Sequence, residues 1–211
     1  MSNQITTLLL TTLLTCTLSL TANAIPKPGK ADLKSPAKYT VIVEMQNKSL
    51  GSFQIDITRK WAPNGADRFY TLVKKDYFKD IALFRAIDGF MVQFGIHGNP
   101  AVSKVWREAK IKDDPKATPK VSNDRGFITF ATAGPHTRTV QLFINTNNNA
   151  FLDSQGFTPF GKVDKKGLQI FDKVFKGYGE KPNQGQIQAQ GNNYLSKSFP
   201  KLDYIKSIKL K

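Results

Sequence analysis

The chain has 211 residues, and 31 Lys and Arg against 16 Asp and Glu give it a formal net charge of +15. Basic chains of this size can bind nucleic acid, but here the basic residues are spread along the sequence rather than gathered in one run. This spread favours a solvated basic surface with weak affinity for anionic polymers or envelope surfaces, and no specific nucleic-acid site.

The first 24 residues contain no Lys, Arg, Asp or Glu, and an apolar core runs from Leu8 to Leu20 before Ala22-Asn23-Ala24. An apolar core of about 13 residues followed by a small-x-small site is typical of a secretory signal peptide. It is shorter than the ~20 apolar residues that span a bilayer. We expect cleavage near Ala24 and export to the periplasm or the medium, although the usual positive start is absent. The alternative is an unprocessed apolar tail or anchor.

Cysteine chemistry is excluded from the exported form. The one cysteine, Cys16, lies inside the apolar segment, so cleavage leaves neither disulfides nor a thiol. The Pro-, Lys- and Ser-rich residues 25–37 are expected to form a flexible N-terminal arm. No internal repeat or second core is evident in residues 38–211, which we therefore interpret as one domain.

The elements of this domain follow from hydrophobic periodicity. Residues 39–45 and 51–57 alternate apolar and polar side chains around a turn, which predicts a β-hairpin. Helical spacing and Pro63 in the first turn predict a helix over residues 63–75. Short apolar runs between turn residues then predict several strands. They are interrupted by a polar stretch near residues 99–125, whose role the sequence leaves open.

The C-terminal part supplies a second helix and a last strand. We expect a helix over residues 168–175, a polar loop rich in Gln and Asn, and a closing strand over residues 202–210. Two helices with many short strands predict a mainly β fold, a closed or nearly closed barrel.

Three separated segments combine apolar and aromatic residues with few polar ones, an arrangement suited to holding an apolar group beside a cation: residues 83–93, 130–143 and 151–161. Their order and spacing resemble the cyclophilin family of peptidyl-prolyl isomerases, over about residues 39–210. The resemblance implies a closed eight-stranded antiparallel barrel capped by two α-helices. It also implies an enzyme that accelerates cis–trans rotation about X-Pro bonds and assists the folding of exported proteins.

The chemistry of this reaction suits the residues present. The X-Pro bond has partial double-bond character and a rotation barrier of about 20 kcal/mol. Lowering that barrier needs no metal, cofactor or nucleophile, but a grip on the proline ring and a donor that favours the twisted amide. An arginine never deprotonates, and its planar fork can serve two acceptors.

The resemblance assigns the site residues by their place in the motif. Arg85, in Arg-x-Ile-x-Gly-Phe-Met-x-Gln, aligns with the catalytic arginine of the family, and Gln93 is expected to orient it. The expected substrate-binding residues are Phe90, Met91, Ala131, Thr132, Gln141, Phe143, Phe151, Leu152 and Phe157, of which Phe151 and Phe157 are expected to close the rim.

Two departures bear on specificity. Phe151 and Phe157 stand where many family members have Trp and His, so we expect reduced sensitivity to cyclosporin with activity retained. These replacements and the chain's ending look like those of exported bacterial members. His97 and His136 lack cysteine partners, and we expect no metal site.

The expected partners are proline-containing unfolded or flexible polypeptides, bound by a monomer. One alternative is a peptide-binding or holdase-like chaperone module on the same fold with weak isomerase activity. Another is a basic surface-binding protein, recognised by salt-sensitive retention on acidic polymers. The presence of both Arg85 and Gln93 favours the enzyme, because a binder could keep the apolar slot without them.

Overall fold

The structure is a computed structural model that describes residues 26–115 and 121–211, so the expected signal peptide lies outside the described residues. Strand β1 (Lys38–Met45) pairs antiparallel with β2 (Ser52–Thr58). Alternate side chains of both strands, such as Val43 and Ile55, are fully buried, because successive residues of a strand point to opposite faces. The expected hairpin is confirmed.

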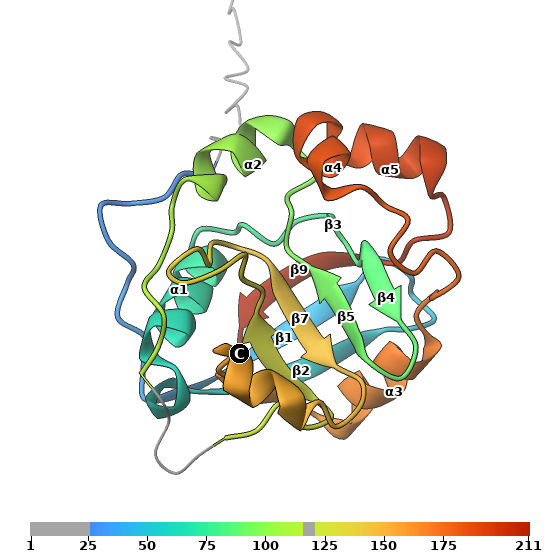
Figure 1. Ribbon diagram of the computed structural model, residues 1–211. Coiled ribbons are helices and arrows are strands. Elements are labelled where there is room, and N and C mark those ends of the chain that lie inside the picture. The colour runs from blue at the N-terminus through green and yellow to red at the C-terminus, as the bar shows by residue number, and fades with distance from the viewer. Residues whose placement is uncertain (1–25, 116–120) are drawn as a thin grey trace, which may run out of the picture.

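Nine antiparallel strands form one curled sheet in the order β3-β9-β1-β2-β8-β6-β7-β5-β4 (Figure 1). Six short strands of the described chain follow β2: β3 (Ile81–Ala82), β4 (Arg85–Ile87), β5 (Met91–Phe94), β6 (Phe127–Phe130), β7 (Leu142–Asn145) and β8 (Gly161–Val163). The last strand, β9 (Tyr204–Leu210), is longer. The expected mainly β fold is confirmed.

The strand count differs from the expected eight. The two ends of the sheet, β3 and β4, are consecutive in the chain and separated only by the buried residues Leu83 and Phe84. Within the described residues these two strands are not paired with each other. The two edge strands, β3 and β4, are therefore joined by the covalent chain at residues 83–84 and not by a ladder of hydrogen bonds.

The two expected helices pack against the sheet. Helix α1 (Pro63–Lys74) contacts β9, and α3 (Lys165–Lys173) contacts β2 and β8. Helix α3 begins three residues before the expected start. The reason is Asp164, whose side chain accepts a hydrogen bond of 2.7 Å from the Gly167 backbone N–H and so caps the helix.

Three further helices were not expected from the sequence: α2 (Pro100–Arg107), α4 (Gln184–Gln190) and α5 (Asn192–Ser198). They lie together at one end of the barrel (Figure 1). Two short 3₁₀ helices, η1 (Arg59–Trp61) and η2 (Ala150–Gln155), complete the elements. In the described part of the chain, every helix is too short or too polar to cross a membrane.

Helices α4 and α5 could not be predicted from hydrophobic periodicity because each buries a single apolar side chain. Helix α4 buries Ile187 alone and α5 buries Leu195 alone. One apolar residue per helix gives no 3.6-residue period. Both side chains join a small core cluster with Phe84 and Ile96 that is separate from the main barrel core.

The segment before β1 lies on the surface of the domain. Residues 26–37, the described part of the arm expected over residues 25–37, form no helix or strand but make specific contacts. The Pro26 carbonyl accepts a hydrogen bond of 2.7 Å from the buried Trp106 indole N–H. Asp32 forms an ion pair of 2.8 Å with the buried Arg68 of α1. These contacts attach the arm to α1 and α2.

The stability of the fold should depend on pH through His97, which follows β5. Burial lowers the pKa of His97 from its ordinary 6.5 to about 4, and its Nδ1 accepts a hydrogen bond of 2.9 Å from the Asn99 backbone N–H. Because the unfolded chain binds this proton more readily, the stabilisation is complete above pH 6.5 and is lost as the pH falls toward 4.

We predict that the urea unfolding free energy of the wild-type protein decreases between pH 7.5 and pH 5. In His97→Gln, which cannot titrate at this position, the decrease should be smaller. Equal decreases in both proteins would contradict a contribution from His97.

Candidate active site

Strand pairing brings the central site residues together. In the antiparallel β4–β5 pair Arg85 lies opposite Gln93, and in the β5–β7 pair Gln93 lies opposite Phe143. Directly opposite residues project from the same face of a sheet. Met91 is two positions from Gln93 and so shares this face. Arg85, Met91, Gln93 and Phe143 therefore form one cluster of side chains on this face of the sheet.

This cluster opens into a cavity of about 410 Å³. The residues expected from the sequence that line it are Arg85, Phe90, Met91, Gln93, Ala131, Thr132, Gln141, Phe143, Leu152 and Phe157. Phe151 is placed differently: it is 56% exposed and stacks on Phe90 at a ring-centroid distance of 5.9 Å. It lies at the rim and does not line the cavity.

Four lining residues were not expected: Ala133, Thr137, Thr139 and Gln184. The first three belong to the loop between β6 and β7, next to the matched Ala131 and Thr132. Gln184 begins helix α4, an element that the sequence did not reveal. A small residue and hydroxyl residues in a loop carry no periodic signal, so only the tertiary structure could assign them to the site.

The floor of the cavity is apolar. Met91, Phe143 and Leu152 are all buried and form a cluster of their own beside the main core. Phe157 packs edge-on against Phe143 with ring centroids 5.6 Å apart. A floor of this kind suits a flat apolar ring, since its burial removes apolar area from water.

Arg85 is the one charged side chain among the described residues that line the cavity. Its Nη1 donates to Gln93 Oε1 at 3.2 Å, and Gln93 Nε2 donates to Gln141 Oε1 at 2.8 Å. Gln93 is buried, so this chain of hydrogen bonds fixes the guanidinium at the edge of the apolar floor. On its outer side Arg85 Nε donates to Glu180 Oε1 at 2.8 Å.

A buried polar network lies behind the floor. The Asn149 side-chain amide donates to the Phe90 carbonyl at 2.8 Å and to Asn145 Oδ1 at 2.7 Å. Asn145 in turn donates to Asn123 Oδ1 at 3.3 Å, and Thr129 donates to the same oxygen at 2.9 Å. Sequence reasoning missed Asn145 and Asn149 because their Asn-rich run is typical of a solvated loop.

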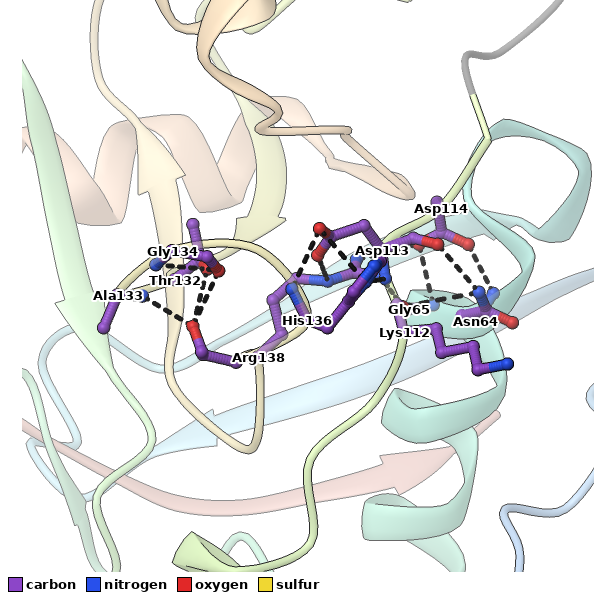
Figure 2. A network of polar contacts seen from close by, with 11 residues as sticks. Asn64, Gly65, Lys112, Asp113, Asp114, Thr132, Ala133, Gly134, His136 and Arg138 are labelled. Atoms are coloured by element: carbon purple, nitrogen blue, oxygen red, sulfur yellow. Dashed lines mark hydrogen bonds and ion pairs between the residues drawn. The ribbon is translucent and has the colours of Figure 1, made fainter.

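Asp113 and Asp114, from the polar stretch near residues 99–125, contact the loop that supplies one wall of the cavity (Figure 2). Arg138, in the wall loop of residues 132–139, donates from Nη1 to Asp114 Oδ2 at 2.8 Å. The two side chains are 3% and 0% exposed. Asp114 also accepts a hydrogen bond of 3.0 Å from the Gly65 backbone N–H in the first turn of α1. One carboxylate thus ties the wall loop to a helix N-terminus, where negative charge is favourable.

A second pair of contacts holds the tip of the same loop. The His136 backbone N–H donates to Asp113 Oδ2 at 3.0 Å, and the Asp113 backbone N–H donates to His136 Nδ1 at 3.0 Å (Figure 2). His136 has a φ of 59°, a left-handed conformation that non-glycine residues adopt only when their surroundings impose it. The contacts with Asp113 supply that constraint.

The site as built can hold an apolar ring on its floor while a fixed cation donates to an acceptor beside it. In residues 26–115 and 121–211, no group of three or more His, Cys, Asp or Glu is placed to hold a metal ion. Fold and site together define a β-barrel with an arginine at the edge of an apolar pocket.

Comparison with known proteins identifies the family. The model of the family described as cyclophilin type peptidyl-prolyl cis-trans isomerase/CLD matches residues 41–191. The chain therefore belongs to the cyclophilin-type peptidyl-prolyl cis-trans isomerase family, as its motifs indicated.

Similar proteins occur in distant organisms. A peptidyl-prolyl cis-trans isomerase of Acinetobacter baylyi is 32% identical over 147 residues, covering 67% of this chain and 76% of that protein. Mouse peptidyl-prolyl cis-trans isomerase-like 3 is 31% identical over 129 residues, covering 60% and 78%. The crystal structure of a cyclophilin-type isomerase from Cryptosporidium parvum aligns with a TM-score of 0.58 at 20% identity, covering 82% and 98% of the two chains. That likeness supports the fold.

The buried Asp114–Arg138 pair should dominate the stability of the wall. We predict that Asp114→Ala lowers the free energy of unfolding by about 3 kcal/mol, because it leaves a buried guanidinium without its closest carboxylate. The matched variant Asp113→Ala removes the more distant partner of Arg138, a side chain that is 35% exposed and lies 3.4 Å from Arg138 Nε, and it should cost about 1 kcal/mol or less. Urea denaturation of both variants measures the difference. Equal losses of unfolding free energy would contradict the buried Asp114–Arg138 pair as the main stabilising contact of the wall loop.

Proposed function

We propose that the protein is a peptidyl-prolyl cis–trans isomerase that accelerates rotation about X-Pro bonds in unfolded or flexible polypeptides. The observation that carries this proposal is the Arg85 guanidinium, held by Gln93 at the edge of an apolar cavity of about 410 Å³. The family membership of the chain supports the same reaction.

The mechanism follows from the electronic change during rotation. As the C–N bond twists it loses conjugation, and the prolyl nitrogen becomes pyramidal and gains a lone pair that can accept a hydrogen bond. A guanidinium N–H directed at the amide is charge-assisted, and it stabilises the twisted state more than the planar one. Only such differential stabilisation accelerates a reaction.

The remaining groups position the substrate. Met91, Phe143 and Leu152 would hold the proline ring, and Phe157 would cover one side of it. Gln93 restricts Arg85 to one orientation, so that little reorganisation is needed during the reaction. Preorganised donors of this kind are a large term in enzyme catalysis.

The test is the isomerisation rate of an Ala-Pro peptide with purified wild-type protein, Arg85→Ala and Arg85→Lys. We predict that Arg85→Ala lowers kcat/KM by about 100-fold, the scale of losing one preorganised donor. Arg85→Lys should recover only part of the loss, because a lysine keeps the charge but not the planar fork.

Peptide binding, measured by fluorescence anisotropy, should persist in both variants because the apolar floor is intact. A wild-type protein that binds the peptide without accelerating its isomerisation would instead be a peptide-binding or holdase-like module.

We further propose that the enzyme is exported, as a bacterial-type member that assists folding of exported proteins as a monomer. The uncharged N-terminal segment ending in Ala22-Asn23-Ala24 supports export. The net charge of +15 supports weak contact with anionic envelope surfaces.

We predict that expression of the full chain in a bacterium yields a periplasmic or secreted protein whose first residue is Ile25, found by N-terminal sequencing. Replacing Ala24 with a bulky residue such as Phe should impair cleavage and leave a longer product. A wild-type product that keeps its N-terminal segment and sediments with membranes would indicate an anchor instead.

A further inference from the structure

The chain between α3 and α4 returns to the active site along the free edge of β4. Gly179 forms an isolated antiparallel bridge with Ala86, the residue after Arg85. Gly179 has a φ of 54°, a left-handed conformation in which glycine carries no steric cost. The bridge fixes the backbone beside Arg85, so Glu180 follows at a defined place.

Aromatic packing anchors the same segment. The Tyr178 ring lies 4.8 Å from the Phe175 ring and 5.1 Å from the Phe199 ring, measured between centroids. The Phe175 backbone N–H donates to Asp203 Oδ2 at 2.9 Å. Glu180 is thus carried by an ordered turn rather than by a free loop.

Glu180 contacts the arginine of the site directly. Arg85 donates from Nε and from Nη2 to Glu180 Oε1, and from Nη1 to Gln93 Oε1. A guanidinium has five N–H groups, and Arg85 Nη1 also donates weakly to Met91 Sδ at 3.9 Å, so one N–H on Nη2 is not used in these four contacts. Glu180 therefore leaves Arg85 able to donate to a substrate, while its carboxylate offsets the positive charge.

The Glu180 carboxylate is more exposed than the Arg85 guanidinium, so an incoming peptide approaches the negative charge before the positive one. The Glu180 side chain is 64% exposed and that of Arg85 is 27% exposed. Both bonds from Arg85 end on Oε1, so Oε2 is not used by the pair. A basic side chain beside the proline could approach Oε2, whereas an acidic one would be repelled by the carboxylate before reaching Arg85.

We propose that Glu180 is a specificity-determining residue that neutralises Arg85 at the mouth of the pocket and selects X-Pro segments with basic or neutral neighbouring side chains over acidic ones. The inference rests on the proposed isomerase function and names its substrate class. Glu180 does not itself line the cavity but contacts Arg85 from outside it, and apart from Arg85 the described residues that line the cavity are uncharged.

The test compares kcat/KM for three peptides, Lys-Pro, Ala-Pro and Glu-Pro, in the full protein and in Glu180→Gln. The wild type should prefer Lys-Pro to Glu-Pro, and Glu180→Gln should lower that ratio about fivefold. The change should shrink in 0.5 M salt, because exposed charges are screened. Glu180→Asp, which keeps the charge, should retain most of the preference.

Glu44→Gln is the matched control. It removes the same charge from an exposed ion pair with Lys206 on the β1–β9 pair, and it should leave the peptide ratio unchanged. An unchanged ratio in Glu180→Gln, an equal change in Glu44→Gln, or a proportional loss on all three peptides would overturn the proposal. Absence of activity in the wild type would instead refute the isomerase function on which it rests.

Discussion

The antiparallel register of β4, β5 and β7 is the constraint on which the site depends. It sets Arg85 opposite Gln93 and Gln93 opposite Phe143. A slip of one residue would turn these side chains to the other face of the sheet. The donor, the residue that orients it and part of the apolar floor therefore come from one hydrogen-bonded ladder.

The register alone does not make a rigid pocket, and buried polar groups supply the rest. Asn123, Asn145 and Asn149 link the floor to neighbouring loops, and Asp114 joins the wall loop to α1. Buried polar groups are costly unless they are paired. Their mutual pairing therefore specifies one arrangement of the loops around the apolar floor.

The free edge of β4 is where another part of the chain reaches the arginine of the site. The strand that carries Arg85 is the last of the sheet, so one side of β4 is open to other parts of the chain. The turn at Gly179 covers part of this edge and brings a carboxylate to the arginine. Covering a free edge also protects it from pairing with another chain.

The sequence by itself determined the features that depend on near neighbours. Arg85 and Gln93 fall on one face because a strand alternates with period two, and the hairpin between them is short. The β1–β2 hairpin and α1 likewise followed from periodicity. The family resemblance, rather than periodicity, predicted that Phe143, Leu152 and Phe157 belong to the site.

Tertiary structure decided what depends on distant partners. Glu180 and Arg85 are 95 residues apart, and Asp114 and Arg138 are 24 apart; no local pattern links either pair. Phe151, expected at the rim of the site, stacks its ring on Phe90 and does not line the cavity. Helices α4 and α5 were missed because packing at the end of the barrel, rather than an apolar stripe, stabilises them. Periodicity indicates which face of a helix or strand is buried, because it depends on neighbouring residues. The residues that pack against that face come from distant parts of the chain, so only the tertiary structure identifies them.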